Sequence, residues 1–279
     1  MTGPHLSSAL LCSCHPVLLS SCPPLEAAPY HTCMISVHDL TRNYGGFTAV
    51  DRISFTVAPG EVLGLVGPNG AGKTTTLRCL SGIIAPSTGR VEIAGHDIQK
   101  NPVEAKRALA FIPDEPHLFD HLTVEEHLRF IGRLYGVADV EERMTPLLNE
   151  LEIADKRKSL STELSRGMKQ KLAIACGLLH DPSVLILDEP LTGLDPGGMR
   201  RMRATIANRA RAGSSVILSS HLLTLVEELC TKLFVIRKGE CVAYGTMAEI
   251  VAAHPNLAGR SLEDVFLALT GTDEQVATA

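Results

Sequence analysis

The feature that most constrains the fold is the segment Gly67–Thr75, which fits the pattern G-x-x-x-x-G-K-[ST]. The run from Glu61 to Val66 predicts a buried strand before it, and Thr75–Gly82 predicts the opening of a helix after it. In this setting the glycines let backbone N–H groups face phosphate oxygens, and the helix N-terminus adds partial positive charge. The segment therefore predicts a nucleoside triphosphate site, with Lys73 at the β- and γ-phosphates and Thr74 on Mg²⁺. The residues expected at the nucleotide are Gly67, Pro68, Asn69, Gly70, Ala71, Gly72, Lys73, Thr74 and Thr75.

Composition narrows the class of partner. Of the 279 residues 45% are hydrophobic, enough for a substantial core. Aromatic residues make up only 4%, with no Trp, so surfaces that stack on single-stranded bases are scarce. The formal net charge of −5 argues against broad binding of a phosphate backbone. We therefore expect no nucleic acid partner.

The two ends of the chain differ from its middle. Residues 1–33 are rich in Ser, Pro and Cys and contain no Lys or Arg, which does not fit a secretory signal with its positive start. We expect a disordered N-terminal extension, with Met34 as an alternative start, and a flexible tail at residues 271–279. No apolar run approaches the length that crosses a bilayer. The chain is expected to be soluble and cytosolic.

Between these ends, strand patterns alternate with helix patterns. Strands are expected at Ile35–Leu40 and Ile53–Val57 on either side of a loop carrying Tyr44. The stretch of about 115–165 lacks strand signals and predicts a helical subdomain, in which Thr123 caps a helix and Glu126 completes a capping box. Further expected strands and helices follow to residue 270. The pattern predicts an α/β fold with a mostly parallel sheet.

Three polar side chains follow strands that are expected to be buried. Asp188 ends the apolar run Val184–Leu187, and a carboxylate there is costly unless it faces a cation such as Mg²⁺. Glu189 is adjacent and could act as general base toward a water molecule. His221 follows the apolar strand Ser215–Ser219 and could reach the γ-phosphate. Parallel sheets place their ligands at such strand ends, so we expect these groups to meet the nucleotide.

Five segments together resemble the nucleotide-binding domain of ABC transporters, over about residues 34–270. They correspond to the family's P-loop, signature motif, Walker B motif, D-loop and H-loop, and are Gly67–Thr75, Leu164–Met168, Val184–Glu189, Gly193–Pro196 and His221. The resemblance implies a P-loop NTPase core with a mostly parallel sheet, an antiparallel β subdomain and an inserted helical subdomain. It also implies ATP and Mg²⁺ as ligands and ATP hydrolysis as the activity.

The resemblance further implies two such domains, identical or different, packed head to tail around two ATP molecules. Ser165 and Gly167 would contact the ATP held by the partner's P-loop, because a helix N-terminus favours an anion. Tyr44 would stack on adenine, and Asp195 would line the junction between subunits. A separate integral membrane permease would hold the pair at the cytoplasmic face of the membrane.

The chain departs from the family pattern at two positions. The signature reads Leu-Ser-Arg-Gly-Met, so that Arg166 could add positive charge near phosphate or point to solvent. Asp114, beside Glu115, stands where the family usually carries Gln, and its carboxylate could still ligate Mg²⁺. These departures resemble export-type members of the family. The same resemblance extends to five segments, which are Pro113–Pro116, Leu122–Glu126, Gly132–Gly136, Ser165–Gln170 and Ser261–Phe266.

Two other classes of protein also use a P-loop. A soluble ABC-type ATPase acting on nucleic acid, ribosomes or cluster assembly would typically carry two cassettes, long coiled-coil insertions or cysteine clusters, and none of these occurs. A small-molecule kinase explains the P-loop but assigns no role to Ser165, Gly167 or His221. The leading interpretation is an ATPase subunit of an exporter; a soluble ABC-type ATPase remains the alternative.

Overall fold

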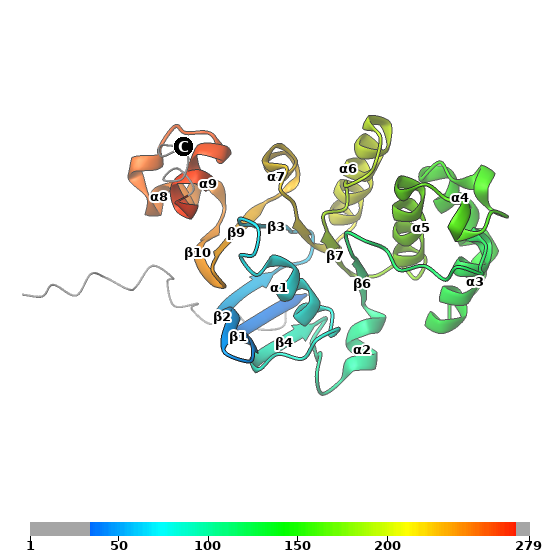
Figure 1. The fold of residues 1–279 in the computed structure, drawn as a ribbon, viewed down its shortest axis with the longest axis horizontal. Coiled ribbons are helices and arrows are strands. Elements are labelled where there is room, and N and C mark those ends of the chain that lie inside the picture. Colours follow the sequence, from blue (N-terminus) through cyan, green and yellow to red (C-terminus); the bar gives the residue numbers. More distant parts are fainter. Residues whose placement is uncertain (1–33, 272–279) are drawn as a thin grey trace, which may run out of the picture.

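The computed structural model describes residues 34–271 (Figure 1). The predicted extension 1–33 lies outside these residues, and so does the predicted tail from residue 272 onward. The described part is an α/β fold with two β-sheets, as predicted. None of its helices is long and apolar enough to span a lipid bilayer.

The larger sheet has six strands in the order β10-β9-β3-β8-β7-β6. Neighbours from β9 to β6 pair in parallel, and only β10 pairs antiparallel with β9. Every residue of β3, β7 and β8 is buried, because helices cover both faces of a parallel sheet. The strands are β3 (Val62–Val66), β6 (Leu109–Ile112), β7 (Val184–Asp188), β8 (Ser215–Ser219), β9 (Lys232–Arg237) and β10 (Glu240–Gly245).

The smaller sheet is antiparallel, in the order β2-β1-β4-β5. Its strands are β1 (Ile35–Tyr44), β2 (Phe47–Val57), β4 (Thr88–Ile93) and β5 (His96–Asp97). The predicted loop between these strands is shorter than expected: Tyr44 pairs with Phe47, and only Gly45 and Gly46 form the turn of a long hairpin. Register shifts between Val37 and Asn43 interrupt the alternation of apolar residues, and for this reason the sequence pattern predicted two shorter strands.

The stretch of about 115–165 predicted as a helical subdomain contains α3 (Val124–Tyr135), α4 (Val140–Glu150) and the 3-10 turns η1 (Ala154–Lys156) and η2 (Ser161–Glu163), and α5 (Arg166–Leu178), which follows it, contacts α3 and α4. Figure 1 shows α3, α4 and α5 gathered at one end of the molecule. The predicted capping box is confirmed, since the Glu126 N–H donates to the Thr123 hydroxyl and the Thr123 N–H to the Glu126 carboxylate. The remaining helices are α1 (Lys73–Leu80), α2 (Pro102–Arg107), α6 (Pro196–Arg211), α7 (Leu223–Leu229), α8 (Met247–Ala253), η3 (Pro255–Leu257) and α9 (Leu262–Thr270).

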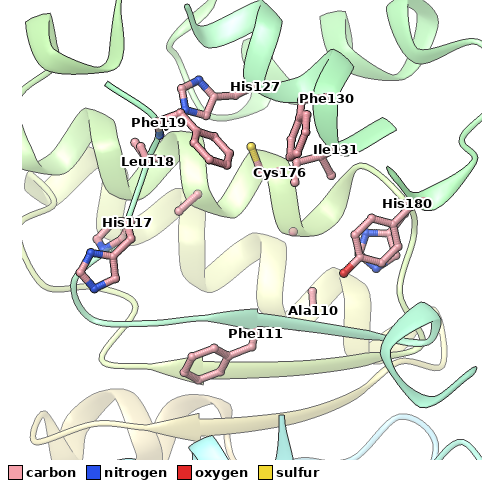
Figure 2. Close-up of a pocket in the computed structure, with 14 residues that line it drawn as sticks. Ala110, Phe111, His117, Leu118, Phe119, His127, Phe130, Ile131, Cys176 and His180 are labelled. Carbon is pink, nitrogen blue, oxygen red and sulfur yellow. Dashed lines mark hydrogen bonds between the residues drawn. The ribbon is translucent and has the colours of Figure 1, made fainter. Parts of the chain in front are cut away.

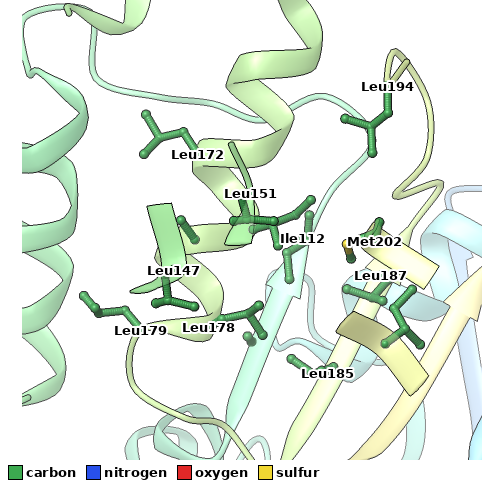
Figure 3. Close-up of a cluster of buried hydrophobic side chains, with 14 of the residues drawn as sticks. Ile112, Leu147, Leu151, Leu172, Leu178, Leu179, Leu185, Leu187, Leu194 and Met202 are labelled. Atoms are coloured by element: carbon green, nitrogen blue, oxygen red, sulfur yellow. The ribbon is translucent and has the colours of Figure 1, made fainter. Parts of the chain in front are cut away.

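The helical subdomain shares a core with the parallel sheet. Leu147 of α4 and Leu172 of α5 belong to the same buried cluster as Ile112 of β6, Leu187 of β7 and Met202 of α6 (Figure 3). Burying each leucine side chain stabilises the fold by roughly 1.5–3 kcal/mol. The loops that leave β6 and β7 therefore start from closely packed strands, which holds their polar side chains in place.

Candidate functional site

A cleft of about 390 Å³ lies where the loops after β3, β6, β7 and β8 meet. Because these strands are parallel neighbours, their carboxyl ends share one edge of the sheet. The residues that line the cleft are Asn69, Gly70, Ala71, Gly72, Lys73, Thr74, Thr75, Asp114, Asp188, Glu189, Thr192 and His221. Segments far apart in the sequence thus form one polar site.

The loop between β3 and α1 curls around the Lys73 ammonium. Lys73 Nζ donates to the carbonyl oxygens of Gly67 at 2.7 Å and Pro68 at 3.2 Å. Burial lowers the pKa of Lys73, although the nearby carboxylates of Glu189 and Asp188 oppose this shift. A half-buried cation among backbone carbonyls and carboxylates can exchange these partners for the oxygens of a phosphate ligand.

Asp188 is held by the next strand. The residue is 4% exposed, and its Oδ1 accepts a hydrogen bond of 2.6 Å from the Ser219 hydroxyl. The two residues are direct partners in the register of β7 and β8. Ser219 was not predicted as a site residue, because nothing in the sequence says which strands are neighbours. Thr192, another lining residue, was also missed.

Glu189 and His221 contact each other at the mouth of the cleft. His221 Nδ1 lies 2.7 Å from Glu189 Oε2, and the His221 backbone N–H donates to the same oxygen at 3.3 Å. Glu189 has a left-handed backbone with φ of 49°. Its side chain thereby lines the cleft beside Asp188 instead of pointing to the opposite face of β7. A carboxylate next to an imidazole suits a proton acceptor for a bound water molecule.

Asp114 also lines the cleft, from the loop after β6. Its Oδ1 is buried without a hydrogen-bond partner, although Arg166 Nη2 lies 3.5 Å away in an ion pair. The side chain of Arg166 passes over the backbone of Gly193. The guanidinium of Arg166 thus faces a carboxylate of its own chain, an arrangement that neither of the two alternatives for Arg166 had described.

Not every predicted site residue reaches the cleft. Ser165 caps α5, with its hydroxyl accepting from the Met168 N–H, and Gly167 packs so closely on Gly193 that a Cβ would lie 2.5 Å from the Gly193 carbonyl oxygen. Asp195 is exposed just before α6. None of Ser165, Gly167 and Asp195 lines the cleft.

Tyr44 does not line the cleft either. Its ring is 45% exposed at the hairpin tip, and the Arg42 guanidinium lies 4.6 Å from the ring centre. Gly67 and Pro68 are likewise absent from the lining and face the loop with their carbonyl groups, which accept from Lys73. Among the predicted phosphate-loop residues, those from Asn69 to Thr75 line the cleft.

The donor set of the cleft fits Mg²⁺ that is brought in by a triphosphate. The Asp188 carboxylate and the Thr74 hydroxyl line the cleft, and so does Asp114, whose buried Oδ1 has no hydrogen-bond donor. Oxygen ligands are what Mg²⁺ prefers, and it is usually held by one or two carboxylates plus substrate phosphates. Within residues 34–271 no group of three or more His, Cys, Asp or Glu side chains could hold a metal by itself. The phosphates would therefore have to complete the coordination.

Comparisons with known proteins identify the family of the chain. The family described as ABC transporter matches residues 50–192. The ABC-type transporter ATP-binding protein EcsA of Bacillus subtilis is 34% identical, over 86% of this chain and 98% of its own length. The Nod factor export ATP-binding protein I of Paraburkholderia xenovorans is 38% identical, over 78% of this chain and 73% of its own.

A solved structure, described as the ATP-binding subunit of an ABC transporter, superposes with a TM-score of 0.81 at 34% identity. It covers 85% of this chain and 99% of its own. The resemblance found in the sequence and the α/β fold are thereby confirmed. The chain belongs to the ABC transporter family, as an ATP-binding subunit.

Proposed function

We propose that the chain binds ATP with Mg²⁺ and hydrolyses it to drive export of a substrate through a partner permease. The observation that carries the proposal is that Lys73, Asp188, Glu189 and His221 line one cleft although they come from the ends of three different strands. The printed name of the P. xenovorans relative describes export. Export by the present chain is part of the proposal.

In the proposed reaction, Lys73 leaves the carbonyl oxygens of Gly67 and Pro68 and binds the β- and γ-phosphates. Bound Mg²⁺ would neutralise phosphate charge, with Thr74 and Asp188 as its protein ligands and Asp114 within reach. Glu189 takes a proton from the water that attacks the γ-phosphorus. The new P–O bond forms as the bond to the β,γ-bridging oxygen breaks, and ADP leaves with that electron pair.

A second copy or a homologous subunit is part of the proposal, because Ser165 and Gly167 lie outside the cleft of their own chain. Ser165 is the N-cap of α5, a helix of 13 residues whose N-terminus presents free N–H groups and partial positive charge. In a head-to-tail pair this helix end would meet the triphosphate on the other P-loop, and Asp195 would lie at the junction. Tyr44 would approach the adenine from the tip of its hairpin.

The permease would dock in an apolar groove of about 200 Å³ between the loop after β6 and helices α3 and α5 (Figure 2). Phe119 is 54% exposed and Phe130 is 44% exposed, and their rings meet edge to face at 5.3 Å. Exposed apolar side chains around a groove are typical of surfaces that bind another protein. An amphipathic helix on the cytoplasmic side of a permease fits this groove, and it would hold the chain at the membrane surface.

Glu189→Gln tests the catalytic part of the proposal. The amide keeps the shape but cannot take up a proton, so hydrolysis should fall by about 100- to 10,000-fold. ATP should still bind, and size-exclusion chromatography with light scattering should show an ATP-dependent dimer. The control is Glu227→Gln, an exposed glutamate on α7, which should behave as wild type. Normal turnover by Glu189→Gln would remove Glu189 as the base.

Phe130→Asp tests the docking groove. The variant should lose co-purification with a polytopic membrane protein from detergent-solubilised membranes while keeping its affinity for ATP. The control is Ile83→Asp, which places the same charge at a side chain that is 57% exposed and lies outside the groove. Co-purification with ribosomes or DNA in place of a membrane protein would support the soluble ABC-type alternative.

A further inference from the structure

Ser219, the last residue of β8, is fully buried next to the candidate site. Its hydroxyl donates to Asp188 Oδ1 at 2.6 Å and accepts from the backbone N–H of Glu189 at 3.1 Å. One side chain is therefore bonded both to the carboxylate expected at Mg²⁺ and to the backbone of the expected general base. Asp188 is the last residue of β7 and pairs in register with Ser219, and Glu189 directly follows that strand.

The bond to Asp188 limits how its carboxylate can rotate. With Oδ1 engaged by Ser219, Oδ2 is the oxygen left free to serve a ligand in the cleft. Hydrogen bonds behind a metal-ligating carboxylate fix its orientation, and removal of such partners typically weakens metal affinity by about 10- to 100-fold. Loss of the hydroxyl would also leave Oδ1 of a buried carboxylate without its donor.

The bond to Glu189 supports an unfavourable backbone conformation. A left-handed φ costs a residue with a side chain roughly 1–2 kcal/mol, and Glu189 adopts a φ of 49°. Its N–H is shared between the hydroxyl of Ser219 and the carbonyl oxygen of Ser219 at 3.2 Å. These bonds help to hold the turn that points the Glu189 side chain toward His221.

We propose that Ser219 is a positioning residue that orients the Mg²⁺-binding carboxylate of Asp188 and the backbone of Glu189 together. The proposal deepens the proposed function and rests on it. Ser219 itself touches no reacting atom and acts through its two partners. Its effect should therefore be seen in the metal dependence of nucleotide binding, which a purely structural role would leave unchanged.

The test compares Ser219→Ala with Ser215→Ala in the full chain. Ser215 is also fully buried, at the opposite end of the same strand, and its hydroxyl donates to the Ala58 carbonyl oxygen at 2.7 Å. Each substitution deletes one buried hydroxyl from β8, so both should lower the melting temperature similarly. Only Ser219→Ala removes a bond to Asp188.

The readout is the dissociation constant of a non-hydrolysable ATP analogue in EDTA divided by its dissociation constant in Mn²⁺. In Ser219→Ala this ratio should shrink toward one, by about tenfold where the wild-type ratio allows it, with affinity in EDTA unchanged. Ser215→Ala should keep the wild-type ratio, and Ser219→Thr, which retains a hydroxyl, should restore it to within about threefold.

A ratio in Ser219→Ala equal to that in Ser215→Ala would overturn the role of Ser219 and leave the proposed ATPase function standing. A wild-type ratio of one would also overturn the role of Ser219, because the metal would then add nothing through Asp188. It would remove Asp188 as a Mg²⁺ ligand from the proposed function while leaving nucleotide binding standing. Absence of analogue binding to the wild type in either buffer would overturn the proposed function as well.

Discussion

Two glycines of the phosphate loop allow two requirements on that loop to be tested separately. One is the space available for a side chain, and the other is a left-handed backbone conformation. Gly70 has a φ of 75° and an added Cβ would meet nothing within 4 Å. Gly72 has a φ of 110°, and its Cβ would lie 2.6 Å from the Ala49 carbonyl oxygen, where ordinary contact begins near 3.4 Å. Alanine at either position strains the backbone, but only at Gly72 does it also overlap the hairpin.

The expected losses in unfolding free energy follow from these angles and distances. Left-handed strain costs roughly 1–2 kcal/mol in both variants, and overlap with a backbone atom that cannot rotate away adds about 1–3 kcal/mol in Gly72→Ala. Because 1 kcal/mol lowers the melting temperature of a chain of this size by about 2–4 °C, Gly72→Ala should unfold at least about 2 °C below Gly70→Ala. Differential scanning calorimetry without nucleotide measures both. Equal melting temperatures would show that the loop tolerates the overlap and would refute the reasoning.

Three further predictions concern groups away from the loop. Burial raises the pKa of the Cys176 thiol to about 12, so at pH 8 iodoacetamide should label it roughly a thousandfold more slowly in the native than in the unfolded protein, as read by mass spectrometry. The hydrogen bond from Arg157 lowers the pKa of the Glu125 carboxyl below its ordinary 4.5. Because the bond favours the ionised carboxylate, it stabilises the folded state above pH 4.5, and this stabilisation is lost as the pH falls through the lowered pKa. The melting-temperature gap between wild type and Arg157→Ala should therefore narrow below about pH 4.5, and a constant gap would contradict this. In a double-mutant cycle of Asp114→Asn and Arg166→Ala, the coupling in unfolding free energy should stay below about 1 kcal/mol, because the side chains are 42% and 58% exposed; a larger value would mean the pair is a structural link.

Local patterns were enough to predict the strand–loop–helix unit at Gly67–Thr75 and the placement of Asp188 after a buried strand. Both depend on neighbours in the sequence: an apolar run, glycines and a helix start. The capping box at Thr123 is of the same kind and was also predictable. For these features the chemistry is encoded within about ten residues.

The role of Ser219 and the ion pair of Asp114 with Arg166 could not be predicted in this way. The first depends on β7 and β8 being neighbours in register, and the second brings together residues 52 positions apart in the sequence. The hairpin at Tyr44 was missed because bulges break the alternation on which a strand prediction depends. Sequence patterns of short period carry no information on such tertiary pairing.

The loop after β6 connects the two cavities on which the proposed function depends. Asp114 lines the nucleotide cleft and Phe119 lines the apolar groove, five positions further along the same loop. The far end of the loop is fixed to the helical subdomain, since the Phe119 N–H donates to His127 Nε2 at 3.0 Å and the Ser161 hydroxyl donates to the Phe119 carbonyl at 2.8 Å. If a bound nucleotide draws Asp114 away from Arg166, the displacement passes along a short, anchored segment to the groove. A permease helix seated there would then meet a different surface in the two states, and a binding partner can respond only to such a difference.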